Sequence, residues 1–73
     1  MVQLEIEHKQ LWIPVVRYDT AHDFTHIDRY NLKGEQRKES LEMSFDEALN
    51  LADEDINENW EKYKNRFLKG LYP

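Results

Sequence analysis

Residues 44–70 read SFDEALNLADEDINENWEKYKNRFLKG, and no other part of the chain keeps one hydrophobic period for so long. The apolar side chains of this stretch stay within a band of about 120° around a helix axis for about six turns. They are Phe45, Ala48, Leu49, Ala52, Ile56, Trp60, Tyr63 and Phe67. Ser44 and Glu47 have the spacing of a capping box, and Gly70 is a typical residue just after a helix end. The sequence therefore predicts one uninterrupted amphipathic helix over residues 44–69.

The chain before this helix has the pattern of β-strands. Residues 2–7 (VQLEIE) alternate apolar and polar side chains, which is typical of a strand with one buried face. Residues 11–18 (LWIPVVRY) begin with an apolar run on both faces, so this strand is expected to be covered on both. Pro14 has no N–H to donate and belongs at an edge or a β-bulge. The sequence leaves open whether residues 8–10 form a turn or a bulge in one long strand.

Two further strands are expected before the helix. Residues 19–23 (DTAHD) have the composition of a turn, and a third strand is predicted over residues 24–31. Gly34 supplies the positive φ of a short hairpin loop, after which residues 36–43 return as a polar edge strand whose charges discourage pairing with another sheet. Together these patterns predict an α+β fold. It consists of an antiparallel meander sheet of three or four strands with one long C-terminal helix packed on one face.

The composition is that of one small domain spanning residues 1–73, with the sheet in residues 1–43. Ten Lys or Arg and fifteen Asp or Glu give a net charge of −5, which argues against general electrostatic binding to nucleic acid. The absence of cysteine excludes disulfides and thiolate zinc sites, and no cofactor is indicated. No signal peptide or membrane-spanning segment is visible, so a cytoplasmic location is expected.

Because the core is small, association with a second copy of the chain is the simplest way to bury additional apolar surface. A single core of this size supplies only about 3–5 kcal/mol. The apolar second face of residues 11–16 and the large aromatic side chains near the helix end both predict contact with a partner subunit. The alternative for the aromatic side chains is cover by the N-terminal strand or by Leu71 and Tyr72. The interface expected from these arguments comprises Trp12, Val16, Trp60, Tyr63 and Phe67. We therefore predict a homodimer that acts as a binding or assembly module, with a further protein partner as the alternative.

Residues 17–30 (RYDTAHDFTHIDRY) concentrate the side chains that could carry chemistry. The candidate catalytic residues are Arg17, Asp19, His22, His26, Asp28 and Tyr30. One interpretation is a small metal-independent ribonuclease-like enzyme. In that enzyme His22 or His26 would be the general base and Arg17 would stabilise the charge of a phosphate.

Two other interpretations of this segment remain. His26 and Asp28 lie two residues apart, so they would share one strand face and could chelate a metal ion. The simplest interpretation is an ordinary polar strand face, with Asp19 and Asp23 capping a turn. It makes a binding module without catalysis the leading prediction.

Two blocks of the sequence resemble a known family. They read WIPVVRYDTAHDFTHIDRYN and EALNLADEDINENWEKYKNRFL, and they resemble small uncharacterised prokaryotic domains with a PVVRYD-T-AH…H-D-Y block and an A…DI..NW..Y…F helix. The matching positions are Arg17, Tyr18, Asp19, His22, His26, Asp28, Tyr30, Asp55, Asn59, Trp60 and Tyr63. These domains are distantly similar to TumE-type components of toxin–antitoxin modules. The resemblance implies a domain of unknown function and assigns no activity. We also expect Asn59 to hydrogen-bond a sheet residue such as His26.

Overall fold

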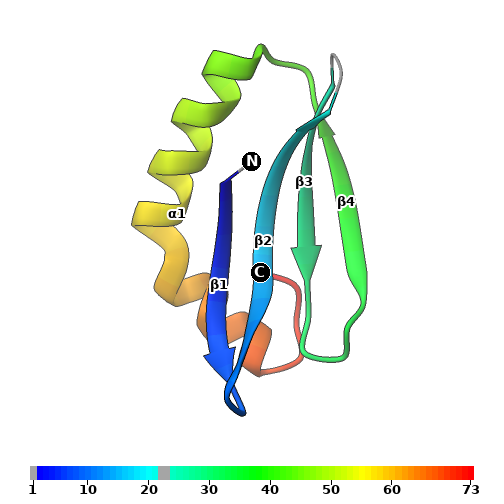
Figure 1. Ribbon diagram of the computed structural model, residues 1–73, viewed down its shortest axis with the longest axis vertical. Helices are drawn as coiled ribbons and strands as arrows, with labels where there is room; N and C mark the ends of the chain where they lie inside the picture. Colours follow the sequence, from blue (N-terminus) through cyan, green and yellow to red (C-terminus); the bar gives the residue numbers. More distant parts are fainter. Residues whose placement is uncertain (1, 22–23) are drawn as a thin grey trace.

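The computed structural model describes residues 2–21 and 24–73 and shows an antiparallel sheet with one long helix (Figure 1). In chain order the elements are β1 (Val2–His8), β2 (Leu11–Ala21), β3 (Phe24–Tyr30), β4 (Gln36–Leu41) and α1 (Phe45–Leu68). The strands lie in the order β1-β2-β3-β4, so each strand pairs with its neighbour in the chain. The predicted α+β meander with a C-terminal helix is confirmed, with four strands among the described residues.

The β1–β2 connection is a tight turn. Lys9 and Gln10 join His8 directly to Leu11, and both have positive φ angles, 51° and 68°. Two-residue hairpin turns favour this backbone because it matches the twist of the strands, although Asn and Gly adopt it more easily than Lys or Gln. This answers the question that the sequence left open for residues 8–10.

The β2–β3 hairpin is longer than the sequence predicted. Asp19 pairs with His26 inside the ladder, and the pairing continues to Ala21 opposite Phe24. The prediction of a turn beginning at Asp19 is therefore wrong, because strand pairing continues past that residue. His22 and Asp23, including the proposed cap at Asp23, lie outside the described residues.

A β-bulge in β2 allows two consecutive residues of its apolar run to be buried in the core. Leu4 pairs with Val16 and Glu5 pairs with Pro14, so Val15 is an additional residue on β2. Both Val15 and Val16 are fully buried and belong to one core cluster. Pro14 borders the bulge, where its missing N–H costs little, as the sequence predicted.

The β3–β4 connection matches the prediction. Gly34 has a φ of 84°, and its N–H donates to the main-chain oxygen of Asn31. The buried Asn31 side chain accepts from the N–H groups of Lys33 and Glu35 at 3.1 Å and holds the loop closed. β4 ends at Leu41, two residues before the predicted end of the strand.

Helix α1 is uninterrupted, as predicted. Ser44 Oγ accepts from the N–H of Glu47 at 3.2 Å at its start. At its end Gly70 has a φ of 80°, and the N–H of Leu71 donates to the main-chain oxygen of Arg66, which is a Schellman motif. In Figure 1 the first part of α1 runs alongside β1, and its last part crosses the sheet. No helix among the described residues is long and apolar enough to cross a membrane.

The core lies between α1 and one face of the sheet. Ala48 and Ala52 are buried, and side chains this small let the helix backbone approach the sheet closely. Phe67, near the end of α1, belongs to the same core and is 2 % exposed. The buried cluster comprises Ile6, Val15, Val16, Tyr18, Ile27, Ala52, Tyr63 and Phe67.

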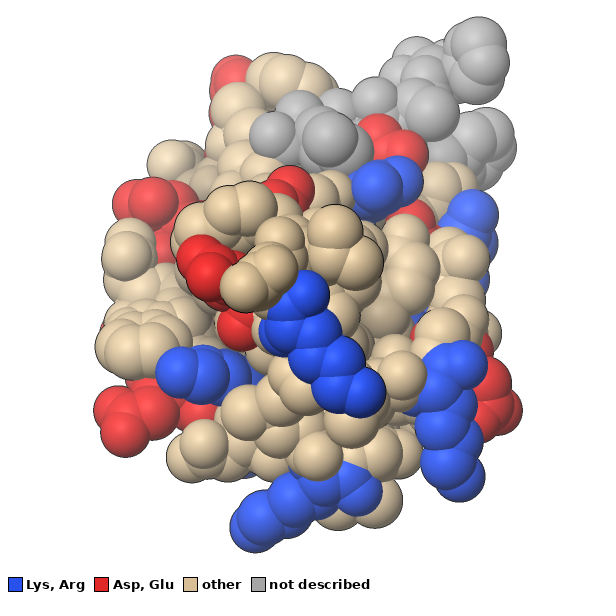
Figure 2. Space-filling view, turned by 60° about the horizontal axis from the view of Figure 1, so that its bottom comes forward, with Lys and Arg blue, Asp and Glu red and all other residues tan. Residues whose placement is uncertain are grey.

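Charge is distributed unevenly along the molecule. The β1–β2 turn, the β3–β4 loop and the end of α1 meet at one end of the molecule, and basic side chains predominate in the lower half of Figure 2, where this end faces the viewer. The basic residues of these three segments are Lys9, Lys33, Lys64, Arg66 and Lys69. The first part of α1 is acidic and carries Asp46, Glu47, Asp53 and Glu54.

Candidate functional site

The sequence-predicted catalytic candidates that the structure describes lie on the sheet face that points away from α1. Tyr18 contacts the helix, so its neighbours Arg17 and Asp19 point to the opposite face. The strand register places Gln3, Arg17, Asp28 and Lys38 side by side across all four strands. This row places four polar side chains on one face of the sheet.

Two polar contacts join neighbours within this row. Arg17 Nε donates to Gln3 Oε1 at 2.8 Å, and Lys38 Nζ lies 3.9 Å from Asp28 Oδ1. Asp28 is 4 % exposed, although its Oδ1 atom makes no hydrogen bond with the described residues. Arg17 is therefore engaged within the sheet through its Nε atom.

His26 and Tyr30 share this face with Asp28, as strand alternation predicted. His26 pairs with Asp19 on β2 and Ser40 on β4, while Tyr30 pairs with Gln36. His22 lies outside the described residues. Among residues 2–21 and 24–73, no group of three or more His, Asp or Glu side chains is placed to hold a metal ion. The structure thus gathers the described candidates on one face without assigning chemistry to them.

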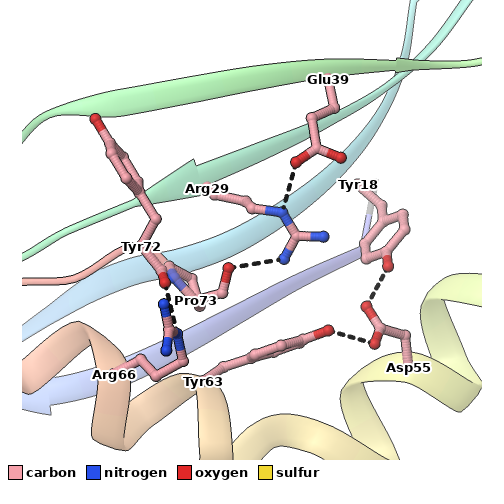
Figure 3. A network of polar contacts seen from close by, with 8 residues as sticks. All are labelled: Tyr18, Arg29, Glu39, Asp55, Tyr63, Arg66, Tyr72 and Pro73. Atoms are coloured by element: carbon pink, nitrogen blue, oxygen red, sulfur yellow. Dashed lines mark hydrogen bonds and ion pairs between the residues drawn. The ribbon is translucent and has the colours of Figure 1, made fainter.

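A separate polar network lies between the helix and the sheet (Figure 3). Asp55 on α1 accepts hydrogen bonds from the hydroxyls of Tyr18 on β2 and Tyr63 on α1, the latter at 2.5 Å. Asn59 Nδ2 donates to the same carboxylate at 2.8 Å. The prediction that Asn59 bonds His26 is wrong, because Asn59 is engaged with Asp55 while His26 lies on the other face of the sheet.

The electrostatics of this network favour a charged aspartate held by neutral tyrosines. Burial alone would raise the pKa of Asp55, but the hydrogen bonds from Tyr18, Tyr63 and Asn59 outweigh it and lower this pKa. Burial, together with hydrogen bonding to Asp55, raises the pKa of both tyrosine hydroxyls. These groups satisfy one another and join the helix to the sheet.

Arg29 extends the network to the last residues of the chain. Its Nε donates to Glu39 at 3.1 Å, its Nη1 donates to the main-chain oxygen of Pro73 at 3.1 Å, and its guanidinium lies 5.7 Å from the centre of the Tyr63 ring. Burial would lower the pKa of Arg29, but hydrogen bonds to Tyr63 and Glu39 raise it. Arg66 binds the main-chain oxygen of Tyr72 at 2.8 Å. The network therefore positions the C-terminal segment on the sheet.

An open groove lies along the outer edge of β1. It is lined by Leu4, Glu5, Ile6, Glu7, Trp12, Trp60 and Lys64, and its volume is about 260 Å³. Trp12 pairs with Glu7 on the sheet face away from α1, and Trp60 projects from the helix. The two indoles, the only Trp residues of the chain, are 66 % and 47 % exposed. They lie on opposite sides of the β1 edge, Trp12 on the side of Glu7 and Trp60 on the side of the helix.

The groove corrects the interface expected from the sequence. Val16, Tyr63 and Phe67 are buried in the core of their own chain, so they are not exposed for contact with a partner. Trp12 and Trp60 remain exposed. No local pattern marks residues 4–7 as a binding edge, because the outer position of β1 follows from the sheet order.

A comparison with family models matched residues 1–72 to a domain of unknown function, DUF7718. The chain belongs to the DUF7718 family. No curated protein and no solved structure matched it. The two sequence blocks predicted an uncharacterised domain family, and the match to DUF7718 confirms that prediction. The match assigns no activity.

Proposed function

We propose that this DUF7718 domain is a protein-binding module that accepts an extended segment of another protein in the groove beside β1. The observation that carries the proposal is the position of Trp12 and Trp60, which are both exposed and face the same strand edge. Tryptophan is among the residues that contribute most to protein interfaces, because it buries a large apolar area with few rotatable bonds.

The shape of this edge favours a single extended peptide over a second copy of the domain as the bound partner. The first part of α1 lies outside β1 in Figure 1. Pairing two β1 strands about a two-fold axis would place them about 4.8 Å apart, whereas two packed helices need about 8–10 Å. The overhanging helices would therefore collide. A single extended peptide requires only the width of one strand.

The wider biological setting follows from the same proposal. A module of this kind would act by assembling with a protein partner in the cytoplasm, and a toxin–antitoxin pair, which the sequence resemblance implies, is one such setting. The homodimer predicted from the sequence is a separate proposal, which light scattering tests directly against the chain mass of 8.9 kDa.

Selection from a phage-displayed library of random short peptides tests the proposal without knowledge of the natural partner. The intact domain is the bait, and the Trp12→Ala and Trp60→Ala variants are the counter-selection. Phe45→Ala is the matched control, because Phe45 is also an exposed aromatic residue of α1 but does not line the groove. We expect enriched peptides that bind the intact domain and the control and lose binding to either Trp variant.

Two outcomes would contradict the proposal. In the first, no peptide is enriched above the level found with the Trp variants, provided that circular dichroism shows that those variants are folded. In the second, light scattering gives about twice 8.9 kDa and the Trp variants return to the monomer mass. That result would assign the groove to a second copy of the chain.

A further inference from the structure

We infer that the bound segment adds to the sheet as a further strand on β1, with basic side chains on one face and apolar side chains on the other. This inference rests on the proposed function and specifies how the groove recognises its partner.

The main chain of β1 supplies the first part of the argument. β1 is the outer strand of the sheet and pairs with β2 along one side only, from Val2 to His8. On its other side, none of the described strands pairs with it. An outer strand presents main-chain N–H and C=O groups at alternate residues, which an extended peptide can pair with.

The two walls of the groove differ in chemistry. Glu5 and Glu7 are exposed and point to the sheet face away from α1, and Glu5 accepts a hydrogen bond from Gln3 at 2.5 Å that holds its carboxylate there. Lys or Arg side chains of an added strand on this face would lie beside two carboxylates and form favourable cross-strand pairs.

The opposite wall selects apolar side chains. Leu4 and Ile6 point toward the helix, and the indole of Trp60 lies beside them in the groove. Lys64 also lines the helix side, and it would repel a basic side chain placed there. Because side chains alternate along a strand, the segment that fits both walls alternates basic and apolar residues.

Three synthetic heptapeptides test this inference on the intact domain. One alternates Val and Lys, the second alternates Val and Glu, and the third is the Val–Lys peptide with its amides N-methylated along one edge. The emission of Trp12 and Trp60 reports binding, and amide hydrogen exchange reports protection of β1. We expect the Val–Lys peptide to bind about tenfold more tightly than the Val–Glu peptide and to protect residues 2–7, since two cross-strand pairs change from attraction to repulsion. The N-methylated peptide should not bind.

A charge-neutralised variant provides the matched comparison. Combining Glu5→Gln with Glu7→Gln should remove most of the preference for the Val–Lys peptide. Combining Glu54→Gln with Glu58→Gln, two exposed acids of α1 that do not line the groove, should leave it unchanged. Thermal unfolding checks that both variants are folded.

The outcomes separate the inference from the proposed function. Peptides that bind and depend on Trp12 and Trp60, but show no charge preference or leave β1 unprotected, would overturn strand addition and leave the binding module standing. If no peptide, including those enriched by selection, depends on Trp12 and Trp60 for binding, both the strand addition and the proposed binding module are overturned.

Discussion

Asp55 forms a polar contact between the helix and the sheet. Its carboxylate accepts from Tyr18, Tyr63 and Asn59, and thereby joins β2 to two turns of α1. A charge at such a position is tolerated because donors surround it, and the same donors lose their acceptor when it is removed.

Replacing Asp55 by Asn should lower the free energy of unfolding by about 1.5–3 kcal/mol, because the amide carries no charge and replaces one of the two accepting oxygens by a donor, so that at least one hydrogen bond is lost. Urea denaturation at neutral pH measures the change. Glu58→Gln, an exposed change on the same helix, should stay within about 0.5 kcal/mol of the parent. Equal stability of the Asp55→Asn variant and the parent would show that the network does not stabilise the fold.

The same residue predicts a pH dependence. The pKa of Asp55 is lowered from its ordinary value of 3.8 in the folded state, so the unfolded chain binds this proton more readily. The stabilising contribution of Asp55 is therefore complete above that ordinary value and is lost as the pH falls toward the lower folded pKa. Urea midpoints of the parent and of Asp55→Asn should converge below about pH 4. A constant difference between them down to pH 2 would contradict this.

Among the described elements, the β1–β2 turn has a sequence that fits its backbone poorly. Lys9 and Gln10 both have positive φ, which costs a residue with a Cβ atom about 1–2 kcal/mol. Changing them to Asn and Gly, the preferred pair for such a turn, should raise the free energy of unfolding by about 1–2 kcal/mol. Urea denaturation measures the gain. Lys33→Asn in the β3–β4 loop is the control and should give no comparable gain. A destabilised double variant would show that the Lys9 and Gln10 side chains contribute more than the turn geometry requires.

Elements with local causes could be predicted from the sequence. Ser44 and Gly70 mark the helix ends through hydrogen bonds to residues a few positions away, and Gly34 marks its turn for the same reason. Asp19 shows the limit of such reasoning. Its composition suggests a turn, but pairing with His26 on β3 keeps it in a strand.

At the scale of the whole molecule, prediction from the sequence was weaker because the features depend on residues far apart in the chain. The partners of Asp55 are 37 residues away at Tyr18 and 8 residues away at Tyr63. The groove requires β1 to be the outer strand and α1 to lie beside it, which no local pattern specifies. The exposed aromatic residues Trp12 and Trp60 could be named in advance, but Val16 could not be separated from them before the bulge was known.

The uneven distribution of charge has a consequence for how the domain meets other molecules. With the bases of Lys9, Lys33 and Lys69 at one end and the acids of Asp46 and Glu47 at the start of the helix, the molecule is an electric dipole as well as a net anion. Such a molecule rotates in the field of a charged partner before the two surfaces touch. Ionic strength will therefore alter its rate of encounter more than the lifetime of the complex once formed.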